Sequence, residues 1–121
     1  MAPIQTGPLP ADAAAENLRQ ELRRGALVLA VLGRLRTEHY GYALRKSLVE
    51  RGVEIDENTL YPLLRRLETQ GLLDSEWREV DRRPKRFYRL SRVGEEVLAR
   101  LVGQWTDLDA TIRRITEENP S

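Results

Sequence analysis

The feature of this sequence that most constrains its fold is a helical pattern that runs directly into two alternating segments, between residues 58 and 90. Leucines recur first at helical spacing, at Leu60, Leu63, Leu64 and Leu67. Leu73, Ser75 and Trp77 then alternate as a strand, and Tyr88 and Leu90 alternate as its partner. The pattern predicts a helix followed at once by a β-hairpin, with Trp77 packed at the base of the hairpin.

The two predicted strands enclose a cationic tip from Arg82 to Arg86, and further cations follow at Arg89 and Arg92. The net charge of the whole chain is only +1, so these cations form a local basic stripe, which is typical of a phosphate-binding surface. A solubilising turn is the alternative interpretation. A helix with a cationic hairpin favours double-stranded DNA, because the helix can enter a major groove while the hairpin reaches flanking phosphates. The candidate phosphate contacts are Arg82, Arg83, Lys85 and Arg86.

The outward side of the predicted helix carries side chains that can read DNA. Asn and Arg form bidentate hydrogen bonds with base edges, while Thr and Tyr reach phosphates or a thymine methyl group. This side offers Asn58, Thr59, Tyr61, Arg65 and Arg66, and the first four are the candidate contacts. A solvated helix face is the simpler alternative. Asp56 or Asn58 is expected to cap the helix, and Pro62 favours the later cap, since a missing N–H costs least near a helix start.

The composition argues against catalysis and metal binding. There is no cysteine and a single histidine, which excludes disulfides, thiolate metal sites and His-pair zinc centres. No serine lies in a nucleophile-elbow pattern, so we expect no enzyme activity, no cofactor and no metal. The N-terminus does not resemble a signal peptide, and the longest apolar run, Ala26 to Leu32, is too short to cross a bilayer. A cytoplasmic location without membrane contact is expected.

Two further helices are expected before this unit. Residues 1–14 hold three prolines and several alanines and are expected to form a flexible arm. A first helix is predicted at about residues 16–35 and a second at about residues 42–51. The second helix is expected to turn three side chains inward, those of Leu44, Leu48 and Val49.

A long final helix, with Ser91 as its expected cap, carries apolar residues spaced as a heptad seam. Because such a seam packs lengthwise on another helix, and the first helix is apolar on every side at residues 26–32, both helices are expected to form a two-fold dimer. The predicted interface consists of Leu22, Leu29, Leu98, Leu101, Trp105, Leu108, Ile112 and Ile115. The predicted fold is mainly α, a winged helix-turn-helix with a two-stranded β wing. Its parts are an arm (1–14), a DNA-binding domain (15–92) and a C-terminal dimerisation helix (93–117).

Several motifs resemble the PadR family of bacterial transcriptional regulators. They are HYGYAL (39–44), TLYPLLRRLETQGLL (59–73), SEW (75–77), RPKRFYRLS (83–91) and a glycine at position 94. The resemblance covers residues 26–115 and is to the short form of the family, with one C-terminal helix. It implies a dimeric repressor that is often released by a small effector. By this likeness the third helix is the recognition helix, Tyr42 lies near the DNA backbone, and residues 82–86 form the wing.

The resemblance also implies an effector site. Similar small members of the family can place a tryptophan from each protomer at the dimer interface, where two indoles sandwich a planar aromatic compound. Trp105 occupies a seam position here, and Asp109 lies one turn further on, where it would pair with a cationic ligand. A plain core tryptophan is the alternative.

The sequence therefore predicts a dimeric repressor that binds a near-palindromic operator. A winged-helix module that binds a protein without binding DNA is the alternative function. Such a module would need an exposed apolar patch on the third helix, where this sequence has cations.

Overall fold

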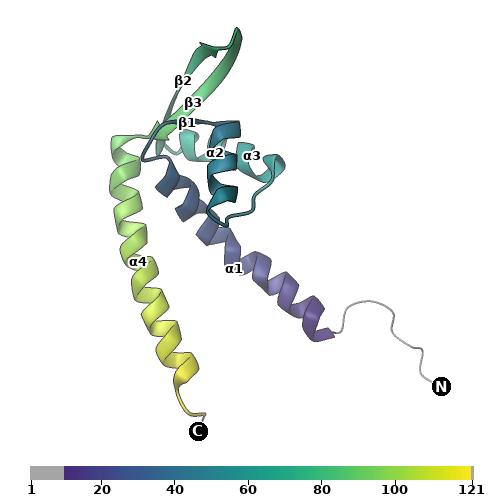
Figure 1. The fold of residues 1–121 in the computed structure, drawn as a ribbon. Helices are drawn as coiled ribbons and strands as arrows, with labels where there is room; N and C mark the ends of the chain where they lie inside the picture. The colour runs from purple at the N-terminus through teal and green to yellow at the C-terminus, as the bar shows by residue number, and fades with distance from the viewer. Residues whose placement is uncertain (1–9, 121) are drawn as a thin grey trace, which may run out of the picture.

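The computed structural model describes residues 10–120 of the chain. Within them, four helices and three strands follow in the order α1 (Pro10–Arg34), β1 (His39–Tyr40), α2 (Gly41–Glu50), α3 (Glu57–Thr69), β2 (Leu73–Val80), β3 (Arg83–Leu90) and α4 (Arg92–Glu117). Figure 1 shows the β2–β3 hairpin projecting from one end of the helical body, while α4 and the N-terminal part of α1 extend away from it. The predicted fold class, a mainly helical winged helix, is confirmed.

The sheet has three antiparallel strands in the order β1-β3-β2, one more than predicted. In β1, His39 lies opposite Tyr88 and Tyr40 opposite Phe87. Two residues are too few to show the alternation by which a strand is detected in a sequence. Their pairing nevertheless ties the start of α2 to the wing, because β1 ends where α2 begins.

The turn of the hairpin is shorter than the predicted tip. β2 and β3 pair along their whole length, from Leu73 opposite Leu90 to Val80 opposite Arg83. Only Asp81 and Arg82 connect them, with φ angles of 52° and 65°. Positive φ at both central residues is characteristic of a type I′ turn, whose twist matches that of the flanking strands. The prediction that all of residues 82–86 form the tip is therefore wrong, since residues 83–86 belong to β3.

The core consists mainly of leucines, as the helical spacing predicted. The four leucines of α3 are all buried. They pack with Leu32 of α1, Leu35 directly after α1, Leu44 and Leu48 of α2, and Leu98 of α4. The start of α4 is held against the end of α3 by Ser91, whose hydroxyl donates to the Gly71 carbonyl at 2.6 Å and accepts from the Gly94 amide at 3.0 Å. The predicted Ser91 cap is confirmed.

Three local predictions about the helices are wrong. α1 begins at Pro10, so residues 10–14, expected in the arm, are helical; proline suits the first helical position and the alanines that follow favour helix. Residues 1–9 of the predicted arm lie outside the described residues. The cap of α3 is Asp56 and not Asn58, because the Asp56 carboxylate accepts from the Thr59 amide at 2.8 Å. Val49, expected to face inward, is exposed at the end of α2.

α1 and α4 meet near the body and diverge towards their free ends (Figure 1). The diverging parts carry large apolar side chains that the described residues leave exposed, with exposed fractions between 46% and 71%. They are Leu18, Leu22, Val102, Trp105, Leu108, Ile112 and Ile115. Among residues 10–120, no helix combines the length and the apolar character needed to cross a membrane.

Candidate nucleic-acid interface

The outward face of α3 is a narrow polar stripe. Helical geometry places Asn58, Pro62, Arg65 and Thr69 in one row, opposite the buried leucines. All four are exposed, and so are Thr59 and Arg66 beside the row. The predicted candidates Asn58, Thr59 and Arg65 thus lie where a groove could receive them. Arg66, which the helical spacing also placed on the outward side but which is not among the candidate contacts, is exposed beside them.

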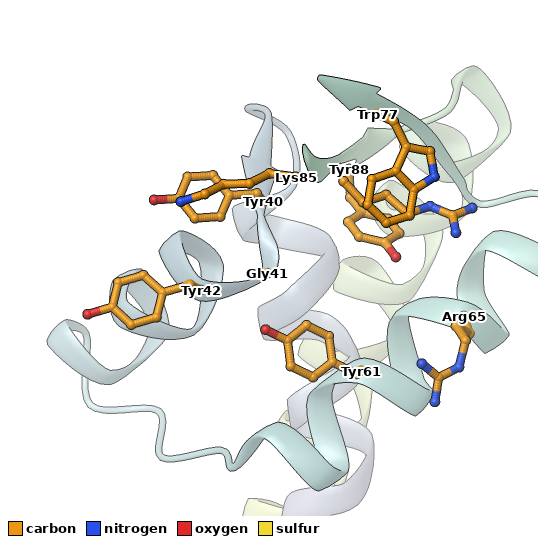
Figure 2. Close-up of a pocket in the computed structure, with 9 residues that line it drawn as sticks. Tyr40, Gly41, Tyr42, Tyr61, Arg65, Trp77, Lys85 and Tyr88 are labelled. Atoms are coloured by element: carbon orange, nitrogen blue, oxygen red, sulfur yellow. The ribbon is translucent and has the colours of Figure 1, made fainter. Parts of the chain in front are cut away.

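Tyr61 differs from the other candidates because it is half-buried and packs against the core. Its ring lies against the backbone of Gly41, at the start of α2, so closely that a Cβ atom at position 41 would overlap the ring carbon atoms. Tyr61 therefore lies on the flank of α3, and its ring points towards the start of α2 (Figure 2). The sequence showed both residues in the HYGYAL and TLYP motifs but not their contact.

A cleft of about 430 Å³ separates α3 from the wing, and Figure 2 shows the side chains that surround it. It is lined by Tyr40, Gly41, Tyr42, Tyr61, Arg65, Trp77, Lys85, Arg86 and Tyr88. The lining contains aromatic rings and three cations but no carboxylate, which suits an anionic partner. Burial raises the pKa of the Tyr88 hydroxyl above its usual value of 10.0, so this group is a neutral hydrogen-bond donor at physiological pH.

Trp77 forms one wall of this cleft. It was expected to pack at the base of the hairpin, but 64% of it is exposed. Trp77 lies directly opposite Arg86 in the β2–β3 register, and the Arg86 guanidinium carbon is 5.7 Å from the indole centroid. The indole is therefore held at the surface by a cation and not by the core.

The predicted wing cations separate into two groups. Arg82 lies in the turn, and Arg83 and Lys85 point to one face of β3, because side chains alternate along a strand. Arg82 and Arg83 are exposed, while Lys85 reaches sideways so that its Nζ lies 4.2 Å from the Tyr40 ring centroid (Figure 2). Tyr42, at the start of α2, also lines this cleft and is 61% exposed.

Arg86 forms the second group. Its side chain points to the opposite face of β3, where its Nη2 lies 2.8 Å from the Glu68 carboxylate and its Nε lies 2.9 Å from the Ser75 hydroxyl. Its charge is therefore offset by an acid of α3. Adjacent cations in a sequence look equivalent, so this difference appears only when the strand face and the partner are known.

The predicted interface residues on α1 and α4 differ in burial. Leu98 is buried in the core of the single chain, and Leu29 and Leu101 are half-buried against that core. The remaining ones, from Leu22 on α1 to Ile115 on α4, are exposed. Trp105 lines a groove of about 370 Å³ between α1 and α4, together with Gly25, Val28, Leu29, Leu101, Gln104 and Leu108. Asp109 does not line this groove, and its carboxylate pairs with Arg113 at 3.0 Å.

Comparisons with known proteins agree with this geometry. Residues 28–100 match the model of the transcriptional regulator PadR-like family. The chain is 40% identical over 80 residues to Transcriptional regulator Rv3488 of Mycobacterium tuberculosis, a match that covers 65% of this chain and 75% of that protein. The crystal structure of a PadR family transcriptional regulator from Eggerthella lenta is similar, with a TM-score of 0.85 and 46% identity over 90% of this chain and 97% of that one. A Streptococcus transcriptional regulator has a TM-score of 0.72 and 30% identity, over 80% and 98% of the two chains. The chain belongs to the PadR-like family of transcriptional regulators, a family of DNA-binding proteins and not of enzymes.

Proposed function

We propose that this DNA-binding regulator is a dimeric repressor of sequence-specific operators. The observation that carries the proposal is the exposed polar row on α3 beside an acid-free cleft and the exposed cations Arg82 and Arg83. Asn58 and Arg65 would read base edges in a major groove. The turn and Arg83 would bind flanking phosphates, and Tyr42 and Lys85 would approach the backbone across the cleft.

The proposal of a dimer is supported by the apolar side chains that α1 and α4 leave exposed. Exposed apolar surface that is continuous over two helices is characteristic of an interface between subunits. In a two-fold dimer, two α3 helices would enter successive major grooves roughly 34–36 Å apart, so the operator would be a near-palindrome. A dimer bound across a promoter would exclude RNA polymerase.

The groove beside Trp105 supports a second part of the proposal, a binding site for a planar aromatic effector. In a dimer the same groove of each protomer would lie near the two-fold axis, and facing indoles would stack on a flat ligand. Such a ligand would release DNA only if it binds a spacing of the two α3 helices that DNA does not accept. Titration of flat aromatic dyes into a Trp77→Phe variant isolates the fluorescence of Trp105. We expect quenching there, and its absence with every dye would count against the site.

The experiment that tests the main function is capture of genomic fragments. The purified protein is incubated with sheared DNA of its source organism at about physiological salt, because protein–DNA affinity depends steeply on salt. We expect enrichment of one or a few near-palindromic fragments, and loss of the enrichment in an Arg65→Ala variant. Uniform recovery, or none, would favour the alternative of a protein-binding winged helix.

A further inference from the structure

Arg86 lies in a closed ring of hydrogen bonds between the recognition helix and the wing. Its Nε donates to Ser75 Oγ at 2.9 Å, and its Nη2 donates to Glu68 Oε1 at 2.8 Å. Ser75 Oγ in turn donates to the second carboxylate oxygen of Glu68. The three side chains come from β3, β2 and α3, so the ring joins the last turn of the helix to both strands of the hairpin.

Glu68 occupies a position where a carboxylate is unfavourable by itself. It lies in the last turn of α3, whose C-terminal end carries a partial negative charge. Its side chain is only 26% exposed, and a partly desolvated carboxylate requires a partner. Arg86 supplies the compensating charge, and its planar fork serves Ser75 and Glu68 at the same time. A lysine ammonium has no such fork and does not reproduce this geometry.

We propose that Arg86 is a positioning residue that sets the orientation of the wing relative to α3, through Glu68 and Ser75, and is not one of the phosphate contacts. The inference rests on the proposed function, because this orientation matters only when helix and wing engage one duplex together. α3 carries the side chains for base edges, and the wing carries those for phosphates. A change in their relative orientation therefore weakens binding to the operator but leaves non-specific binding, which depends on charge, unaltered.

The test uses two duplexes: the fragment most enriched by the wild-type protein in the capture experiment, and a shuffled duplex of equal length. Arg86→Lys keeps the charge and loses the fork. We expect it to bind the enriched fragment about tenfold more weakly, with unchanged affinity for the shuffled duplex and an unchanged salt dependence. Arg100→Lys makes the same exchange at an exposed position of α4, away from α3 and the wing. It is the control and is expected to bind both duplexes as the wild type does. Arg83→Gln removes a phosphate contact, so it should weaken binding to both duplexes. It should also lower the slope of log affinity against log salt by about 0.9.

Glu68→Gln separates the two possible roles of Arg86 by the direction of its effect. If Arg86 positions the wing, Glu68→Gln weakens binding to the enriched fragment, and the double variant with Arg86→Lys binds no more weakly than either single variant. If Arg86 is a phosphate contact restrained by Glu68, Arg86→Lys binds as the wild type does and Glu68→Gln strengthens binding to both duplexes. That result would overturn the proposal.

Ser75→Ala removes only one hydroxyl from the ring and provides a milder variant, expected to act in the same direction as Arg86→Lys. Thermal unfolding of each variant identifies any that fail to fold. An equal loss on both duplexes from Arg86→Lys and Ser75→Ala, in folded proteins, would also overturn the proposal. Equal affinity of the wild-type protein for the two duplexes would contradict the proposed function itself, and this result is visible before any variant is made.

Discussion

At the scale of single residues, the contact between Gly41 and Tyr61 sets how closely α2 approaches α3. The Tyr61 ring occupies the space that a Cβ atom would fill at position 41. A glycine is therefore required at the start of α2 for steric reasons and not for its conformational freedom. The same contact holds Tyr61 in the lining of the cleft (Figure 2).

We expect Gly41→Ala to lower the free energy of unfolding by about 1–3 kcal/mol, because an added methyl group in a filled space forces neighbours to shift. Tyr61→Ala removes the obstructing ring, so adding Gly41→Ala to it should cost much less than it does in the wild type. Tyr61→Phe keeps the obstructing ring carbons and should give no such relief. Urea unfolding of the wild type, the three single variants and the two double variants measures the coupling, and additive effects of Gly41→Ala and Tyr61→Ala would contradict the proposed overlap.

Asp56 is the second residue whose contribution to stability can be measured by itself, because that contribution depends on pH. Hydrogen bonds from Thr59, first from its side chain and then from its backbone, hold the pKa of the Asp56 carboxyl below the usual value of 3.8. A carboxyl whose pKa is lowered in the folded state stabilises the protein above its unfolded-state pKa, and this stabilisation is lost as the pH falls through the folded-state pKa.

We therefore expect Asp56→Ala to lower Tm by roughly 4 °C at pH 7 through loss of the α3 cap. The difference from the wild type should shrink as the pH falls below the usual pKa of 3.8 and through the lower pKa of the folded-state carboxyl. Asp56→Asn is the matched control, because asparagine caps helices without titrating. A difference that is the same at every pH would show that the charge of Asp56 has no part in the cap.

At the scale of the elements, the turn of the wing consists of two residues in an unfavourable backbone conformation. Asp81 and Arg82 adopt the left-handed conformation that glycine and asparagine favour in type I′ turns. An arginine there is unfavourable for the stability of the hairpin, yet it places a cation at the furthest point of the wing. We interpret this as strain kept at a binding surface.

Arg82→Gly should relieve this strain and raise the free energy of unfolding by up to about 1 kcal/mol. The same change removes one cation, so the salt slope of operator binding should fall by about 0.9. Arg83→Gly provides the contrast: it should lower the salt slope similarly but destabilise the protein, because glycine is unfavourable within a strand. Thermal unfolding and binding at several salt concentrations measure both quantities. If Arg82→Gly is less stable than the wild type, the turn is not strained.

How well the elements could be predicted depended on the range of the interactions that define them. The leucine spacing of α3 and the alternation of β2 and β3 are periodic over many residues, and they located these elements correctly. β1 has no period to detect and exists only through its pairing with β3. The end of the hairpin was misplaced because a two-residue turn without glycine carries no sequence signal.

At the scale of the whole molecule, α1 and α4 diverge from the helical body (Figure 1). Both carry large apolar side chains that the described residues leave exposed. On α4 the exposed apolar side chains lie on one face, while Ala110 lies on the opposite face. This asymmetry makes it possible to test the dimer with one substitution on each face.

Leu108→Glu places a charge within the apolar face, and we expect it to shift the protein to a monomer at micromolar concentration, as measured by light scattering. Operator affinity should then fall by at least about a hundredfold, because the second half-site no longer binds as part of the same molecule. Ala110→Glu adds the same charge on the opposite face and should remain dimeric. A wild-type protein that is already monomeric and still binds one half-site would contradict the proposed dimer.

The sequence alone determined the order of the helices and of the two long strands, the buried leucines and the family, because each depends on local periodicity or on motifs that can be read residue by residue. Only the tertiary structure decided the contact of Gly41 with Tyr61, the exposure of Trp77 and the allocation of Leu98 to the core of one chain. The clearest case is Arg86, which is indistinguishable from Arg83 in the sequence but is paired with Glu68, 18 residues away, in the fold. Neighbouring cations carry the same charge, and it is the face of the strand and the partner opposite it that decide what each one does.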